Sequence, residues 1–199
     1  SKSGLVPPKE VIKAMGIGDV VMSTPVFRNI KNLLPNASLS VLVSVPVDEV
    51  LKENPYIDKL HSLPQGLTSK NIEKMIGALI DEMNREEFDL IINLQSKNVS
   101  SSILKKVHSR WKIDRSYYYR DKLTDVLVGC ETLNRSGIER DLDCLRRIGL
   151  EPKDKYTEVF LQNADIDYAE KFFKKNNLDI NKKTIFLHPV ASIEIREWG

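Results

Sequence analysis

The residues best suited to chemistry in this sequence form a glycine-rich turn that ends in a carboxylate, residues 16–19 (GIGD). The apolar run at residues 11–15 predicts a strand, and from Val20 onward apolar residues return at helical spacing. A turn from a strand into a helix lies at the carboxyl end of that strand, where open α/β proteins bind their ligands. Asp19 therefore stands where a carboxylate could act as a general base on a substrate hydroxyl.

The glycines of this turn are not expected to form a dinucleotide-binding site. Gly16 and Gly18 permit a tight turn and a close approach of a ligand to the backbone. The fingerprint GxGxxG is not met, because Val21 stands where helix–strand packing needs Gly or Ala. A carboxylate at the positive end of a helix dipole also disfavours a diphosphate. Two roles stay open for Asp19, an N-cap of the following helix and a general base, and one residue could serve as both.

The bulk composition is that of an ordinary globular protein, with 199 residues, 41% hydrophobic and 29% charged. A net charge of +2 is too small to indicate a nucleic-acid partner. No apolar run reaches the roughly 20 residues that span a bilayer. Cys130 and Cys144 are expected to be reduced thiols, which favours a cytoplasmic protein. Neither they nor His61, His108 and His188 have the spacing of a metal site.

Strand-like and helix-like segments alternate along the first 150 residues. Strands are predicted at residues 38–44, 57–63, 89–94 and 110–113, and helices at residues 47–54, 69–87, 99–108 and 137–148. Gly149 is predicted to close the last helix as its C′ residue. This alternation favours an α/β fold with a parallel sheet covered by helices.

The chain changes character after residue 150. Residues 151–155 (EPKDK) are polar and contain a proline, which is typical of a linker. A helix is predicted over residues 165–176 and a strand over residues 184–187, which would begin a second α/β unit. We therefore predict an N-terminal domain over residues 1–150, a linker over 151–163, and the start of a C-terminal domain over 164–199.

Residues 16–25 (GIGDVVMSTP) resemble the opening signature of glycosyltransferase family nine, the ADP-heptose:lipopolysaccharide heptosyltransferases. Further similar segments follow in the order in which the family has them. They are residues 53–58 (ENPYID), residues 88–95 (FDLIINLQ), the segment from Glu139 to Leu150, and residues 188–192 (HPVAS) with Arg196 and Trp198. The resemblance covers nearly the whole chain.

The resemblance implies a GT-B fold, in which two Rossmann-like domains face each other across a cleft. The N-terminal domain takes the acceptor and the C-terminal domain takes the nucleotide sugar. The implied reaction is an inverting transfer of heptose from ADP-heptose to the lipopolysaccharide inner core, with the nucleotide sugar as a substrate and with no cofactor or metal. Asp19 matches the family's proposed base, and Ser192 and Arg196 match its donor-phosphate loop.

A second loop is expected to face the same cleft as Asp19. It follows the strand at residues 89–94 and contains Gln95 and Lys97. Both would lie on the acceptor side, because the carboxyl ends of parallel strands meet at one edge of the sheet. Lys97 could contact an anionic acceptor, or it could be an ordinary solvated loop lysine.

A basic cluster surrounds Trp111. It consists of Lys105, Lys106, His108, Arg110 and Lys112. The cluster could rest on an anionic membrane surface, which would suit a lipid-linked acceptor, or it could be a solvated helix end. On the first alternative the protein would be peripheral at the cytoplasmic face of the inner membrane.

Two other functions stay open from the sequence. One is a degenerate or truncated relative that holds a sugar or lipid acceptor without transfer. Val190 in place of the family's glycine, Arg196 in place of its lysine, and the end of the chain at Gly199 favour it. The other is a flavodoxin-like or response-regulator single domain, which fits the alternation of elements but leaves residues 184–198 unexplained.

Overall fold

The structure is a computed structural model, which describes residues 10–12, 16–95, 98–115, 124–128, 135–179, 181–185 and 187. The chain divides into two compact units, Ser1–Phe160 and Leu161–Gly199. Cys130 lies outside the described residues, and Cys144 is fully buried in the core of the first unit. No helix in the described part of the chain is long and apolar enough to cross a bilayer.

The first unit contains a six-stranded sheet in the order β3-β2-β1-β4-β5-β6. The strands are β1 (Glu10–Ile12), β2 (Ser40–Ser44), β3 (Lys59–Leu63), β4 (Phe88–Asn93), β5 (Ser109–Arg115) and β6 (Val126–Val128). Every neighbouring pair is parallel. The predicted parallel α/β fold is confirmed, and the strand order is that of a doubly wound Rossmann sheet. Strand β6 is an edge strand of three residues that the sequence patterns did not predict.

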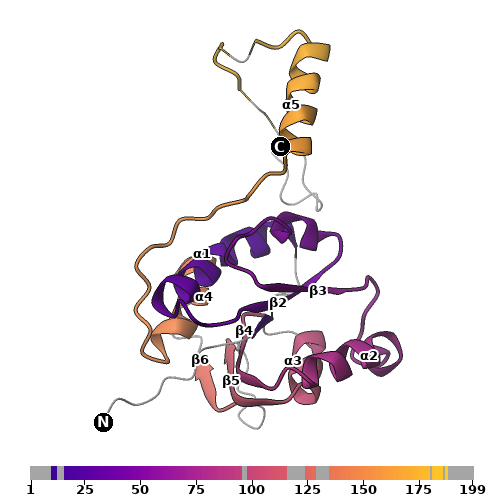
Figure 1. The fold of residues 1–199 in the computed structure, drawn as a ribbon, viewed down its shortest axis with the longest axis vertical. Helices are drawn as coiled ribbons and strands as arrows, with labels where there is room; N and C mark the ends of the chain where they lie inside the picture. The colour runs from indigo at the N-terminus through magenta and orange to yellow at the C-terminus, as the bar shows by residue number, and fades with distance from the viewer. Residues whose placement is uncertain are drawn as a thin grey trace, which may run out of the picture. The chain divides into compact units, whose positions relative to one another are not determined.

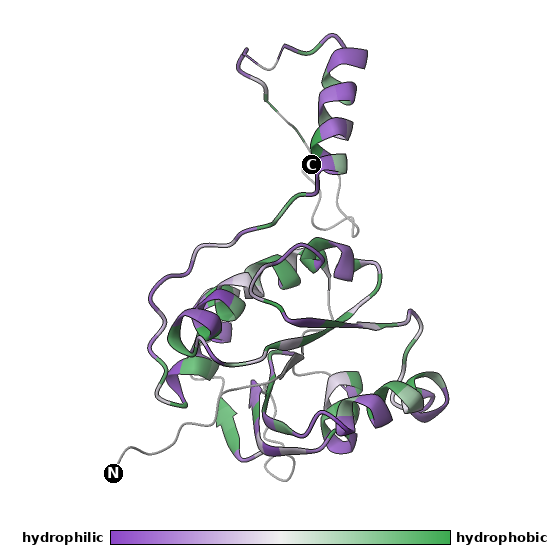
Figure 2. Cartoon of the chain, viewed as in Figure 1, coloured by the Kyte–Doolittle hydropathy of each residue, from purple (hydrophilic) through white to green (hydrophobic). Residues whose placement is uncertain are grey.

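Helices cover both faces of this sheet (Figure 1). They are α1 (Ile17–Leu33), α2 (Ile72–Asn84), α3 (Asn98–Lys106) and α4 (Gly137–Arg146), with a 3₁₀ helix η1 (Val47–Leu51). Side chains of a strand alternate between faces, so Val41 and Val43 pack with α1 and α4, whereas Leu42 packs with α2 and α3. Figure 2 shows β6 as hydrophobic and the helices as carrying both kinds of residue, as amphipathic elements do.

The end of α4 confirms a local prediction. Gly149 has φ of +81°, a left-handed conformation that favours glycine. Its N–H donates to the Arg146 carbonyl, that of the C2 residue, at 3.0 Å, and the Leu150 N–H donates to the Leu145 carbonyl at 3.0 Å. These are the two hydrogen bonds of a Schellman motif, and they identify Gly149 as the C′ residue.

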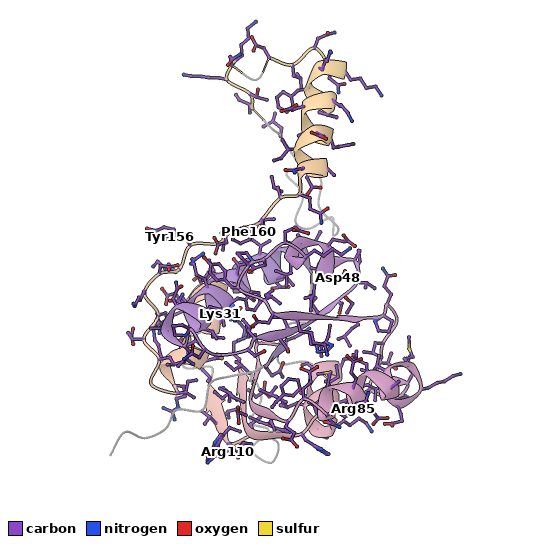
Figure 3. The ribbon with its side chains drawn as sticks, in the orientation of Figure 1. Lys31, Asp48, Arg85, Arg110, Tyr156 and Phe160 are labelled. Atoms are coloured by element: carbon purple, nitrogen blue, oxygen red, sulfur yellow. The ribbon has the colours of Figure 1, made fainter. Side chains whose placement is uncertain are left out.

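The first part of the expected linker, residues 151–160, is fixed to the first unit. The Asn29 side chain on α1 hydrogen bonds to the backbone of Lys153 and Asp154. Farther along, the ring of Phe160 packs edge-on against that of Tyr56, with centroids 6.1 Å apart. Figure 3 labels Tyr156 and Phe160 on this segment. The segment therefore belongs to the compact unit, although it has no regular secondary structure.

The second unit contains one helix, α5 (Asn163–Lys175), in its described residues. None of the residues of α5 is buried. The strand predicted over residues 184–187 is wrong for the residues that are described there, which form no strand. Ile185 is 84% exposed and Leu187 is 79% exposed. A strand needs a neighbour to satisfy its backbone hydrogen bonds, and the described part of this unit offers none.

Candidate functional site

The candidate site lies at the carboxyl edge of the sheet, where the strand order reverses. Strand β1 pairs with β2 on one side and with β4 on the other. The chain proceeds outward from β1 to β3 and then returns to β4, so the turns after β1 and β4 leave the sheet as neighbours. This is the topological switch point, where doubly wound sheets form their ligand crevice. The turn after β1 leads to Asp19, and the turn after β4 contains Gln95.

Asp19 lies in the first turn of α1 and is not its N-cap. The helix begins at Ile17, and the N-cap residue is Gly16, which has no side chain with which to cap. The alternative that Asp19 is an N-cap is therefore wrong. Its side chain is partly buried. The carboxylate has no hydrogen bond or ion pair with any residue that the structure describes, and its nearest role in the fold is to complement the helix dipole.

The two glycines beside Asp19 leave open space rather than make a turn. Gly16 has φ of −56° and ψ of 162°, angles that any residue can adopt. Gly18 lies within α1 and has no positive φ. A Cβ atom added to either glycine would meet no described atom within 4 Å. The backbone angles at these positions therefore do not require glycine, and the prediction of a tight turn that needs it is wrong. The predicted room for a ligand beside the backbone is present.

Gln95 brings a buried amide oxygen without a described partner to the same edge. The residue is 6% exposed, and its Oε1 is buried with no hydrogen-bond partner among the described residues. Its backbone is fixed, because its N–H donates to Asn93 Oδ1 at 3.1 Å and its carbonyl accepts from the Ser100 hydroxyl. A buried polar atom without a partner is costly, so this oxygen marks a place for a ligand or a water molecule.

Two buried polar networks near this edge are absent from the predictions. On the face covered by α3, Asn93 Nδ2 donates to Asp114 Oδ1 at 2.9 Å. On the face covered by α1 and α4, Ser23 Oγ donates to Asp141 Oδ2 at 2.8 Å, and Arg115 forms an ion pair with Asp141. The second network has a signal in the sequence, because Ser23 and Asp141 each follow an apolar residue of the inward helix face by three positions, Val20 and Ile138.

The other predicted site residues cannot be placed. Lys97, Ser192 and Arg196 lie outside the described residues, and so does His188. Among the predicted site residues, the structure therefore places only Gly16, Gly18, Asp19 and Gln95. They lie at the same edge of the sheet because β1 pairs with β4. Within the described ranges, no group of three or more His, Cys, Asp or Glu side chains could hold a metal ion.

Comparison with known proteins gives relatives of a single kind. No family model matches the chain. Lipopolysaccharide heptosyltransferase 3 of Escherichia coli K12 is 25% identical over 185 residues, which covers 91% of this chain and 53% of that protein. Lipopolysaccharide heptosyltransferase 1 of Campylobacter coli is 25% identical over 199 residues, covering 92% of this chain and 55% of that protein. The chain thus spans about half the length of the curated relatives it matches.

Solved structures support the fold. The glycosyl transferase family 9 protein from Veillonella parvula DSM 2008 has a TM-score of 0.86 at 17% identity, over 96% of this chain and 56% of that one. The Escherichia coli heptosyltransferase WaaC, solved with ADP-2-deoxy-2-fluoro heptose, has a TM-score of 0.63 at 12% identity, over 75% of this chain and 50% of that one. With the curated relatives and the ordered motifs along the sequence, these likenesses lead to one conclusion: the chain is similar in sequence to the lipopolysaccharide heptosyltransferases, and its fold is similar to that of glycosyltransferase family nine.

Proposed function

We propose that the protein is an inverting glycosyltransferase that moves heptose from ADP-heptose to a lipopolysaccharide inner-core acceptor, and that this chain is its N-terminal, acceptor-binding part. The observation that carries the proposal is the Asp19 carboxylate, which stands at the switch point without a hydrogen bond or ion pair to any described residue. Both oxygens of such a carboxylate are available to accept a hydrogen bond from a substrate hydroxyl.

In this proposal Asp19 acts as the general base. The acceptor hydroxyl oxygen attacks the anomeric carbon of heptose from the face opposite the diphosphate. Its proton passes to Asp19, the bond from the sugar to the diphosphate breaks, and ADP leaves with the electron pair. The helix dipole favours the charged carboxylate, so the proton is transferred late, when the attacking hydroxyl has become acidic. Such a base contributes about 10²- to 10⁴-fold to a rate.

The other roles rest on the resemblance and on position. Gln95 is proposed to bind an acceptor hydroxyl through its buried amide oxygen, Oε1. Lys97 is proposed to contact an anionic group of the acceptor, and Ser192 and Arg196 are proposed to contact the donor phosphates. The nucleotide that WaaC holds in its solved complexes is consistent with an ADP-linked donor for this chain.

A larger donor domain than the second unit described here is part of the proposal. On helix α5, Tyr168 is 71% exposed and Phe172 is 48% exposed, and Leu187 is 79% exposed. Fully burying a large apolar side chain stabilises a protein by about 1.5–3 kcal/mol. Further chain that supplies the remaining strands of a Rossmann-like domain would cover them.

The proposed contact with an anionic inner-membrane surface uses fewer residues than the basic cluster contains. Lys105, His108 and Arg110 are exposed, and Trp111 is 48% exposed. Lys112 turns inward, since its Nζ donates to the Leu104 carbonyl at 2.7 Å and burial lowers its pKa. Figure 3 labels Arg110 at the start of β5, the strand end opposite to the candidate site. Co-sedimentation with phosphatidylglycerol vesicles, lost in Arg110→Glu and absent with phosphatidylcholine vesicles, tests this contact.

The central experiment replaces the base. We expect Asp19→Asn to lower turnover of the full-length protein, with ADP-heptose and a core acceptor, by at least about 10²-fold. Asp81→Asn is the matched control, because Asp81 is an exposed helical aspartate on α2. Both variants should melt at the wild-type temperature. Wild-type turnover in Asp19→Asn would refute the assignment. Acceptor binding without any transfer by the wild-type protein would instead favour a non-catalytic relative.

A further inference from the structure

The first two turns of α1 are poorly stabilised by the helix itself. The N-cap residue is Gly16, and no side chain caps the helix. Gly18 lies in the first turn, where glycine is less favourable than other residues. Pro25 lies inside the helix and cannot donate to the Val21 carbonyl, which accepts instead from Thr24 Oγ1 at 2.8 Å. The position of Asp19 therefore depends on contacts from outside the helix.

Helix α4 provides these contacts. It approaches α1 closely at its own first residue, where a Cβ added to Gly137 would lie 3.2 Å from Met22 Sδ. One turn farther along α4, Asp141 accepts the hydrogen bond from Ser23 at 2.8 Å. Both Ser23 and Asp141 are fully buried. The two helices are thus joined at the turn that follows Asp19.

The Asp141 carboxylate links three elements. It accepts a hydrogen bond from the Ser23 hydroxyl on α1 and forms an ion pair with Arg115 at the end of β5. The Arg115 side chain is 15% exposed. On the other side, Ser23 Oγ lies 2.9 Å from the backbone carbonyl of Asp19. A hydroxyl donates one proton, and the charged carboxylate is the stronger acceptor, so the bond to Asp141 holds Ser23 in place beside Asp19.

Stability alone does not explain this arrangement. The contact between α1 and α4 is otherwise made by buried apolar residues such as Val20, Phe27 and Leu142. Apolar side chains of similar volume would serve at least as well as a buried ion pair, because burying charges carries a desolvation cost. A directional hydrogen bond also fixes the position of the groups that it joins. A general base must be held within a fraction of an ångström of its reactive position.

We infer that Ser23 and Asp141 are positioning residues for the reaction, and that they hold the first turn of α1 so that the Asp19 carboxylate faces the acceptor hydroxyl. This inference rests on the proposed function. It assigns to the buried contact between α1 and α4 a role in turnover rather than in substrate affinity.

The test uses Ser23→Ala in the full-length protein, since alanine fits the site and is favoured in helices. We expect kcat to fall about tenfold while the KM values for donor and acceptor stay within about twofold. The melting temperature should change by less than about 4 °C. Ser102→Ala is the matched control, because Ser102 on α3 donates to the Asn98 carbonyl at 2.8 Å in the same way but has no hydrogen bond to a carboxylate of the described residues. Its kcat should equal that of the wild type.

A double-mutant cycle separates positioning from a general loss of structure. Ser23→Ala should lower the residual rate of Asp19→Asn by less than about twofold, because it acts through Asp19. An equal tenfold loss in both backgrounds, or an unchanged kcat in Ser23→Ala, would overturn the inference. Full turnover in Asp19→Asn would overturn the proposed function itself, whatever Ser23 does.

Amide hydrogen exchange provides a readout that does not depend on activity. The Val20 N–H donates to the Gly16 carbonyl at 3.1 Å and is the first bonded amide of α1. Its exchange should be about tenfold faster in Ser23→Ala and unchanged in Ser102→Ala. Ser23→Cys, which keeps the volume but donates weakly, should behave like Ser23→Ala. Wild-type exchange at Val20 in both Ser23 variants would contradict the positioning role.

Discussion

The Asn29 side chain on α1 donates a hydrogen bond of 2.9 Å from its Nδ2 to the carbonyl of Asp154, and its Oδ1 accepts one of 2.7 Å from the backbone N–H of the preceding residue, Lys153. One amide thereby satisfies a donor and an acceptor of a segment that has no sheet or helix to satisfy them. Arg28, the preceding residue, binds the Asp154 carboxylate and the Tyr156 carbonyl. The segment after α4 is thus attached to the same helix that carries Asp19.

We predict that Asn29→Ala releases this segment. Asn29 is fully buried, and its removal leaves the Lys153 N–H and the Asp154 carbonyl without partners. The free energy of unfolding should fall by about 2 kcal/mol, and the Lys153 amide should exchange faster. Asn32→Ala is the control, because Asn32 is an exposed residue of the same helix. Equal stability of the two variants would show that the amide does not hold the segment.

We predict that Gly18→Ala separates the needs of the fold from those of a substrate. The added Cβ meets no described atom within 4 Å, and alanine is the better helix former, so stability should rise by up to about 1 kcal/mol. Turnover of the full-length protein should nevertheless fall, because the methyl group occupies space that the proposed acceptor uses. Unfolding curves and steady-state rates measure the two effects.

The matched control for that experiment is Gly77→Ala. Gly77 lies in α2, and a Cβ there would meet only Glu73 Oε1, at an ordinary contact distance of 3.5 Å. It should gain stability in the same way and keep full turnover. If Gly18→Ala also keeps full turnover, then the open space beside Asp19 is not part of the acceptor site.

We predict that His61 makes stability depend on pH. His61 is 4% exposed on β3, and its Nε2 lies 3.5 Å from Glu86 Oε1. Burial lowers its pKa from 6.5, with the Lys59 charge acting in the same direction and Glu86 and Glu82 opposing it. The unfolded chain therefore binds the proton more tightly than the folded one. The free energy of unfolding should fall as the pH drops below 6.5, by at most about 1.4 kcal/mol per unit.

The pH effect is isolated by comparing two histidine variants over pH about 5.5 to about 7.5. His61→Gln removes the buried titration and should flatten this part of the stability curve. His108→Gln removes an exposed histidine and should leave the curve as it is in the wild type. A wild-type slope in His61→Gln would mean that other groups account for the dependence.

Much of the fold and part of the site could be predicted because their signals are local. The alternation of strand-like and helix-like segments predicted the parallel sheet. A glycine after a segment of helical periodicity predicted that α4 ends near Gly149. The turn before Asp19 could be found in the same way, from a strand, two glycines and a helix. Which residue caps the helix could not be predicted, because both Gly16 and Asp19 are residue types found at N-caps. The backbone geometry decides where the helix begins, and it places the N-cap at Gly16.

The sequence by itself therefore determined the α/β fold, the resemblance to the heptosyltransferases and the position of the candidate base along the chain. Only the tertiary structure decided that β1 and β4 are neighbours, that Ser23 meets Asp141 at a separation of 118 residues, and that Asn29 holds the chain near Asp154. The physical reason is that periodicity is a property of neighbouring residues. The partner of a buried polar group is chosen by packing between segments that are remote in the chain.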